Sequence, residues 1–214
     1  MSPIKGMDVS HYQGDIDFNK AKADGIEFAM IRAGYGWKDW ENQTDRQYYS
    51  NMSKAKQAGV ARGAYLYSYA LTPEDAKLEA DFFLHLIGGY HLEYPVAYDV
   101  EDASQANLGK ERLTEIADTF LTRVQNAGYY VCLYTNLDWI TYRYDMNKLK
   151  KFDVWYAQYN DRPTYNGQFG MWQHTSKGKV NGVSGNVDLD WSYVDYPSVM
   201  KRVGLNGFPK NCGA

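Results

Sequence analysis

Two carboxylic acids, Asp99 and Glu101, stand two residues apart in the run 94–102 (YPVAYDVED). Because successive side chains of a β-strand point to opposite faces, residues two apart share a face, and both carboxyl groups then lie in one small volume. Two carboxylates in a site of low dielectric cannot both ionise freely, so the pKa of one rises and that group stays protonated near neutral pH. The pair could supply a proton donor beside a negative charge, or it could be a solvated strand end or be neutralised by a Lys or Arg.

Two further acids lie near the two ends of the chain. Asp8 closes the first predicted strand, in the run 6–10 (GMDVS), and Asp188 belongs to the last one, in the run 187–190 (VDLD). In a closed barrel the first and last strands are neighbours, so we expect all four acids to converge on one mouth. Such a cluster is costly unless a cation or a reaction uses it. This concentration of carboxylates favours a catalytic site.

The elements that must position these acids alternate along the chain. Short apolar runs bounded by glycine alternate with segments of helical periodicity, which is typical of an α/β barrel or a doubly wound sheet. The clearest helix spans residues 110–125, and another begins at Thr72-Pro73 and ends at Gly88. The pattern predicts eight strands, at residues 5–10, 28–34, 63–70, 95–101, 129–136, 153–159, 170–175 and 187–191.

The spacing between strands shortens after residue 159, and helical periodicity is absent from there to Ser192. The last three strands therefore lie too close together for full crossover helices, which need about a dozen residues or more. The sequence predicts an α/β barrel of five β/α units followed by three strands, with its active-site face at the C-terminal ends of the strands. We expect one catalytic domain at residues 1–203 and a C-terminal tail or linker at residues 204–214.

Composition and charge exclude several classes of partner. A formal net charge of -3 provides no basic field for binding nucleic acid. No run of about 18 apolar residues is present to insert into a membrane, and the first residues lack the apolar core of a signal peptide. Cys132 and Cys212 form neither a disulfide framework nor a zinc-ligand spacing. The 20 Tyr and 6 Trp residues can pack in a core or stack on sugar rings.

An ordered set of motifs runs along residues 5–200. It comprises residues 6–14 (GMDVSHYQG), 31–34 (IRAG), 63–65 (GAY), 98–101 (YDVE), 134–136 (YTN), 155–159 (WYAQY), 172–173 (WQ) and 187–188 (VD). With these motifs in this order, the chain resembles the family-25 glycoside hydrolases, the Chalaropsis-type lysozymes that are common among phage endolysins.

The resemblance implies a flattened TIM-like barrel that hydrolyses the β-1,4 bond between N-acetylmuramic acid and N-acetylglucosamine in bacterial peptidoglycan, without a cofactor or a metal. By position, Glu101 matches the general acid/base. Asp99 matches the carboxylate that orients the 2-acetamido group of the substrate or stabilises the positive intermediate, and Asp8 and Asp188 match the supporting acids. Retention assisted by the acetamide, nucleophilic attack by Asp99 and inversion by water all stay open.

Aromatic residues at or near predicted strand ends are candidates for a sugar-binding groove, and each could equally pack inside the barrel. They are Tyr65, Tyr67, Tyr134 and Trp172. Tyr35 lies in the loop after the second strand, where loops carry binding more often than packing. Arg32, on the second strand, could pair with Asp8 or with another acid of the mouth.

Two other classes of function stay open. A metal-dependent polysaccharide deacetylase could use Asp8, His11, Asp99 and Glu101, because carboxylates and imidazole bind divalent cations, although a closely spaced histidine ligand set is missing. A noncatalytic glycan-binding module would explain the aromatic residues but not the four acids. Without an export signal, we expect a phage or prophage endolysin held in the host cytoplasm until its release to the cell wall, or a protein acting on the wall from outside. The oligomeric state is left open.

Overall fold

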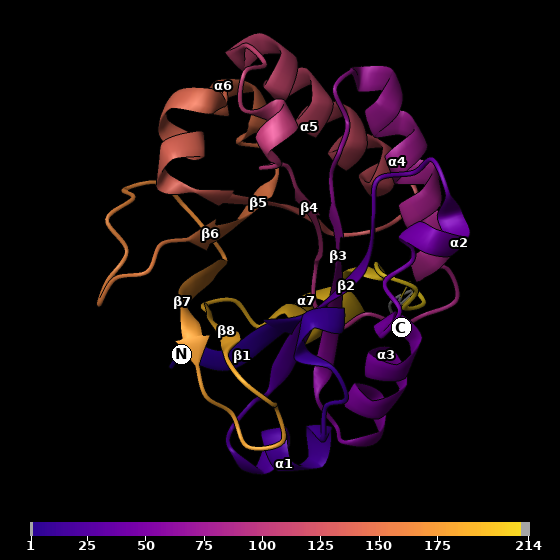
Figure 1. Cartoon of the computed structure of the whole chain (residues 1–214), viewed down its shortest axis with the longest axis vertical. Coiled ribbons are helices and arrows are strands. Elements are labelled where there is room, and N and C mark those ends of the chain that lie inside the picture. The colour runs from indigo at the N-terminus through magenta and orange to yellow at the C-terminus, as the bar shows by residue number, and fades with distance from the viewer. Residues whose placement is uncertain (1, 211–214) are drawn as a thin grey trace.

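A computed structural model describes residues 2–210 and forms a closed barrel of eight strands. The strands neighbour one another in chain order, and the last strand closes the ring against the first (Figure 1). They are β1 (Ile4–Val9), β2 (Phe28–Tyr35), β3 (Ala61–Tyr67), β4 (Val96–Asp99), β5 (Val131–Asn136), β6 (Asp153–Ala157), β7 (Met171–Gly178) and β8 (Val187–Ser192). β1 to β7 run parallel, whereas β8 is antiparallel to both of its neighbours.

Helices lie around the barrel. They are α1 (Phe18–Ala23), α2 (Trp40–Gln43), α3 (Tyr48–Gln57), α4 (Pro73–Ile87), α5 (Lys110–Asn126), α6 (Met146–Leu149) and α7 (Tyr196–Val203), with the short helices η1 (His11–Gln13), η2 (Ala103–Gln105) and η3 (Trp139–Arg143). The longer helices α3, α4 and α5 pack on the outer face of β2 to β5. Within residues 2–210, none of the helices has the length and apolar character needed to cross a membrane.

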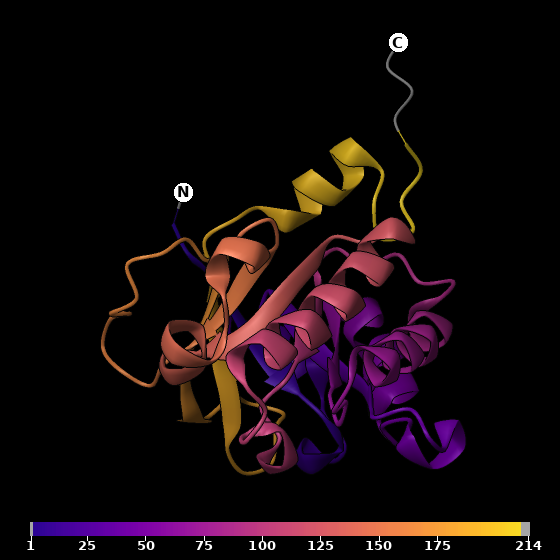
Figure 2. The ribbon, with the colours of Figure 1, turned by 90° about the horizontal axis from the view of Figure 1, so that it is seen from above.

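The predicted architecture of five β/α units followed by three strands is confirmed. No helix separates β6, β7 and β8 in the described part of the chain. The connection from β6 to β7 is instead a long loop at residues 158–170, which projects outward on a side of the barrel without a covering helix (Figure 1). α7 follows β8 and lies across one end of the barrel (Figure 2).

The sequence explains where the two long helices form. α4 starts at a capping box in which Thr72 and Asp75 each bind the backbone N–H of the other, and Pro73 occupies its first turn. α5 buries one stripe of residues that recur every three or four positions, including Leu113, Ile116 and Phe120. These apolar faces pack on the outward side chains of the strands, in a layer between barrel and helices.

Side chains also fill the interior of the barrel. Alternate residues of the strands point inward, and the buried interior cluster includes Met30, Tyr65, Cys132, Trp155 and Met171. A barrel of this size is therefore a packed core and not a channel. Inward-facing acids lie near the C-terminal ends of β1 and β4, at Asp8 and Asp99, which places the candidate chemistry at the mouth of the barrel.

Residues 204–210 pack against the barrel, where the sequence predicted a tail or linker. Asn206 is fully buried, its Oδ1 accepts from Tyr130 N at 2.7 Å, and its Nδ2 donates to Tyr94 O at 2.8 Å. Leu205 and Phe208 also pack against the interior cluster, but the segment is too short and too rich in glycine and polar residues to show an apolar periodicity in the sequence. The domain boundary at residue 203 stays a prediction, and residues 211–214 lie outside the described part of the chain.

Candidate active site

The barrel brings the four predicted acids to one cavity at the C-terminal ends of the parallel strands. The cavity has a volume of about 250 Å³, and Asp8, Asp99, Glu101 and Asp188 all border it. Asp8 of β1 stands directly opposite Asp188 in the register with β8. Because β8 runs antiparallel, its first residues lie at the same end of the barrel as the last residues of β1 and β4. Closure of the barrel therefore creates the cluster.

The fourth strand ends earlier than the sequence predicted. β4 stops at Asp99, and Glu101 lies two residues beyond this last paired position. The placement of Glu101 therefore depends on side-chain contacts and not on ladder hydrogen bonds. One such contact comes from Asn136 at the end of β5, whose Nδ2 donates to Glu101 Oε2 at 3.2 Å.

Burial raises the pKa of both members of the acidic pair. Asp99 is only 7% exposed, and the charge of Glu101 is a second cause that raises its pKa, while the Arg32 guanidinium opposes both. Burial also raises the pKa of Glu101, and the hydrogen bond from Asn136 opposes this shift. Interacting carboxyl groups titrate as a pair, so we expect the pair to retain a proton at pH values where isolated carboxylates are ionised.

A fifth acid, Asp190, lies on the floor of the site. It is fully buried, its Oδ1 accepts from Trp155 Nε1 at 2.7 Å, and its Oδ2 has no partner within the described chain. Burial raises the pKa of Asp190 to about 8. Burial, followed by the charges of Asp190 and Asp188, also raises the pKa of Asp8. Sequence analysis missed Asp190, although its spacing of two from Asp188 places both on one face of β8.

Gln173 of β7 is a second residue that sequence analysis did not assign to the site. Its side chain is buried, and Nε2 donates to Asp8 Oδ2 at 2.7 Å. Its Oε1 accepts from the hydroxyls of Tyr134 and Tyr159, both at 3.0 Å. The amide therefore links an acid of the floor to two tyrosines of the wall. The motif at residues 172–173 was the only signal that pointed to it.

A second cavity of about 330 Å³ adjoins the first. Glu101, Tyr134 and Tyr159 border both cavities, and Asn136 and Gln158 line the second one only. The two hollows together form a groove in which Glu101 occupies the junction. A proton donor at the middle of an extended groove is what cleavage within a polymer requires.

The predicted aromatic residues divide into two groups. Tyr65 and Tyr134 line the cavity of the acids. Tyr67 and Tyr35 lie outside the lining: the Tyr67 hydroxyl donates to Asp102 Oδ2 at 3.2 Å, and the Tyr35 hydroxyl donates to Asn42 O at 2.9 Å.

Trp172 is the clearest correction. Adjacent residues of a strand face opposite sides, and because Gln173 faces the interior, Trp172 faces outward. It packs with Val154 and Tyr156 outside the barrel, and its Nε1 donates to Gln158 O at 2.9 Å. Three aromatic residues absent from the prediction line the cavity of the acids instead, namely Trp155, Tyr159 and Tyr12, of which Tyr12 is 78% exposed.

Arg32 does not pair with Asp8. Its guanidinium contacts Asp45, with Nη2 at 2.9 Å from Oδ2, and His11 Nδ1 lies 3.0 Å from the same oxygen. His11 is thus engaged outside the acidic cluster. Among residues 2–210, no group of three or more His, Cys, Asp or Glu side chains is arranged to hold a metal ion. The geometry gives no support to the metal-dependent deacetylase.

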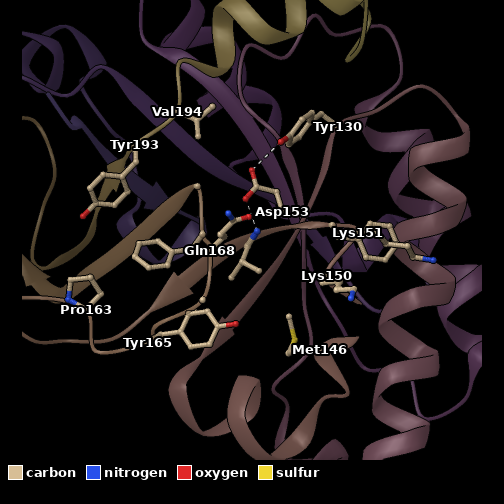
Figure 3. A pocket seen from close by; sticks show the side chains of 15 residues that line it. Tyr130, Met146, Lys150, Lys151, Asp153, Pro163, Tyr165, Gln168, Tyr193 and Val194 are labelled. Atoms are coloured by element: carbon tan, nitrogen blue, oxygen red, sulfur yellow. Dashed lines mark hydrogen bonds between the residues drawn. The ribbon is translucent and has the colours of Figure 1, made fainter. Parts of the chain in front are cut away.

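A cavity larger than either of these lies at the other end of the barrel. It has a volume of about 910 Å³ and is bordered by residues that precede or begin strands, including Tyr130 before β5, Asp153 at the start of β6 and Gly170 before β7. Figure 3 shows the Tyr130 hydroxyl directed at Asp153, at 3.1 Å from Oδ2. No second carboxylate lines this cavity, so it lacks the acid pair that the mouth provides.

Comparison of the sequence with models of known protein families shows to which family this chain belongs. Residues 7–183 match the sequence model of the glycosyl hydrolases family 25. The chain belongs to this family. The resemblance drawn from the motifs is therefore confirmed. In this family-25 chain, Asp188 and Asp190 lie just beyond the matched residues, and closure of the barrel brings them to the site.

Similar proteins of family 25 include lysozymes and autolysins. The chain is 32% identical over 191 residues to the autolytic lysozyme of Clostridium acetobutylicum, a match that covers 87% of this chain and 55% of that protein. Its fold is similar to the bacterial lysozyme from Streptomyces coelicolor, with a TM-score of 0.78, 26% identity and complete coverage of both chains. It is also similar to the modular autolysin LytC from Streptococcus pneumoniae, solved in complex with a synthetic peptidoglycan ligand. Here the TM-score is 0.77 at 26% identity, covering 89% of this chain and 47% of that one. The chain thus spans about half the length of the first and last of these relatives.

Proposed function

We propose that this protein is a muramidase, which hydrolyses the β-1,4 bond between N-acetylmuramic acid and N-acetylglucosamine in bacterial peptidoglycan. The observation that carries the proposal is the convergence of Asp8, Asp99, Glu101 and Asp188 on one cavity of a family-25 barrel. A noncatalytic glycan-binding module would have no use for buried acids, because desolvation of carboxylates costs free energy that a binding site does not recover.

Glu101 is the proposed general acid. It lies at the junction of the two cavities, and it is less buried than Asp99, so a glycosidic oxygen in the groove can approach its carboxyl group. The raised pKa keeps a proton available to the pair. After proton transfer to the leaving oxygen, the Glu101 carboxylate can accept a proton from the attacking water.

Asp99 is the proposed charge-stabilising partner. Its Oδ1 is buried and lacks a hydrogen-bond partner among the described residues, although the side chain borders the cavity. An acetamide N–H of the bound sugar would supply the missing donor. The carboxylate would then hold the acetamide oxygen towards the anomeric carbon and stabilise the positive charge that develops there. This arrangement supports the substrate-assisted route with retention.

Asp8 and Asp188 are proposed to support the pair by fixing the negative field of the mouth. Of the aromatic residues, Tyr65 and Tyr134 stay in the proposed substrate-binding set, because they line the cavity of the acids. We also propose bacterial peptidoglycan as the only macromolecular partner that the catalytic site requires. Release from a host cytoplasm at lysis, as expected of an endolysin, stays a prediction.

Digestion of a defined, purified peptidoglycan tests the proposal. Mass spectrometry of the reduced products should show new reducing ends on muramic acid in a digest with the wild-type protein, and none with Glu101→Gln. New reducing ends on glucosamine would instead identify the protein as a glucosaminidase and contradict the proposal. Tight binding to the wall without any new reducing end would establish the glycan-binding module instead.

A further inference from the structure

Another buried acid, Glu79, lies outside the cavity and has no place in the chemistry described above. It belongs to α4 and is fully buried between this helix and the barrel. A buried carboxylate is costly unless hydrogen bonds compensate it. Its surroundings therefore need an explanation.

Three hydrogen-bond donors converge on the Glu79 carboxylate. Oε2 accepts hydrogen bonds from the Tyr98 hydroxyl and from Ser68 Oγ, the latter at 2.8 Å. Oε1 accepts a hydrogen bond from Tyr69 N at 2.7 Å. An ionised carboxylate only accepts, so it satisfies all three donors at once. A protonated carboxyl group has an O–H donor of its own, which would point at the donors that surround it. The arrangement matches the ionised form.

These donors lead directly to both sides of Glu101. Ser68 N donates to Asp99 O at 2.8 Å, which holds the end of β4. Ser68 Oγ accepts from Gln105 Nε2 at 3.0 Å, and Gln105 Oε1 in turn accepts from Asp102 N at 3.0 Å. Because β4 ends at Asp99, these bonds hold the segment that carries Glu101, together with those from Tyr144 to Val100 O and from Asn136 to Glu101.

We propose that Glu79 is a positioning residue for Glu101, whose ionised carboxylate holds Ser68 and Tyr98 and through them the segment from Asp99 to Gln105. The inference rests on the proposed role of Glu101 as the general acid. Small displacements of a catalytic group have large effects on rate, so release of this segment lowers turnover without removing any reacting atom.

The protonation of Glu79 connects this network to pH. Burial raises the pKa of Glu79 to about 7, against the opposing hydrogen bonds from Tyr98, Tyr69 and Ser68. The other titratable groups that act on it are the Tyr98 phenol from β4 and Asp75, one turn earlier on α4, whose charge raises the pKa further. Protonation places a third hydrogen where the Tyr98 and Ser68 hydroxyls meet Oε2, so one of these hydroxyls must then turn away from Glu79. The bonds described above are complete only for the ionised form.

The Glu79→Gln variant tests the proposal, because glutamine has the size of glutamate and the charge of the protonated form. The readout is the ratio of kcat for wild type to kcat for the variant, measured on soluble uncross-linked glycan strands across the pH range. Titrations of Asp99, Glu101 and the other mouth acids affect both proteins and cancel in this ratio. We expect a ratio near unity at about pH 5, rising to about tenfold at about pH 8.5. KM should change little.

A flat ratio across this range, with both proteins folded, would overturn the proposal. Ser68→Ala should reproduce the high-pH loss, and it replaces Glu79→Gln as the test should that variant fail to fold. Thr114→Val on α5 is the matched control, because it removes a buried hydroxyl that binds Lys110 O and Asp145 N and lies outside this network. Its kcat ratio should stay near unity at every pH. A wild-type protein that releases no muramic acid ends would instead refute the proposed function itself, which separates the two outcomes.

Discussion

Gln173 and Asp8 lie 165 residues apart in the chain, yet Gln173 Nε2 donates a hydrogen bond of 2.7 Å to Asp8 Oδ2 inside the barrel. The opposite atom of the same amide accepts from Tyr134 and Tyr159. Because the amide nitrogen can only donate, this orientation provides a donor for Asp8 Oδ2 and an acceptor for both phenols. Gln173 thus connects the floor of the site to the tyrosines that border both cavities.

Gln173→Glu should disrupt this connection. The substitution adds a further carboxylate beside Asp8, whose pKa is already raised by burial and by the charges of Asp190 and Asp188, and like charges at this distance disfavour ionisation. We expect kcat/KM at neutral pH to fall at least about tenfold, with partial recovery at lower pH as one of the two carboxyls takes up a proton. The pH profile of kcat/KM measures this. Gln125→Glu on the exposed face of α5 is the control, and an equal effect there would show that the loss is not local.

Glu101→Gln should abolish lysis while the fold stays intact, because it removes the proton but keeps the shape. Loss of a general acid costs about 10²- to 10⁴-fold in rate. Turbidity loss of purified cell walls measures the activity, and circular dichroism checks the fold. Normal lysis by this variant would remove Glu101 from the mechanism.

Asp99→Asn should cause a smaller but still large loss, of about 10²- to 10³-fold in kcat, because the proposed role of Asp99 is electrostatic and geometric. The amide also presents an N–H where the carboxylate oxygen would accept from the substrate. Steady-state kinetics on soluble glycan strands measure the change. Wild-type turnover by Asp99→Asn would show that Asp99 has a structural role and none in the reaction.

Asp190 should make the protein less stable as the pH rises. Its pKa is about 8 in the folded state, above the value of about 3.9 in an unfolded chain. A group whose pKa is raised by folding contributes stability below the unfolded pKa, and this contribution is lost as the pH rises through the folded pKa. Between about pH 4 and pH 8, the free energy of unfolding of wild type should therefore fall relative to that of Asp190→Asn, by roughly 1 kcal/mol or more. Denaturant titrations at several pH values measure both, and parallel curves would contradict the prediction.

Asn206→Ala should lower the free energy of unfolding by about 2 to 4 kcal/mol, because it leaves Tyr130 N and Tyr94 O buried without their partners. Asn206 has a φ of 56°, in the left-handed region that alanine disfavours. Asn206→Gly removes the same hydrogen bonds but tolerates this φ, so it should be the less destabilised of the two by about 1 kcal/mol. Thermal unfolding compares the variants. Wild-type stability of both would show that residues 204–210 do not contribute to the barrel.

The sequence by itself determined the number and order of the strands and the four acids that the barrel collects. These features are local, since the alternation of side chains along a strand and the periodicity of a helix can be followed without knowing what packs against them. Asp99 and Glu101 are two residues apart in any fold. The motifs were also sufficient to identify the family.

Only the tertiary structure decided how strands meet and which face of each one is interior. The register of β7 with β8 turns Gln173 inward and Trp172 outward, and the sequence does not distinguish these two orientations. Arg32 contacts Asp45 and not Asp8, and hydrogen bonds join Asp190 to Trp155 and Glu79 to Tyr98, residues on different elements of the fold. Such contacts depend on closure of the barrel, because it sets distances between segments that local periodicity does not specify.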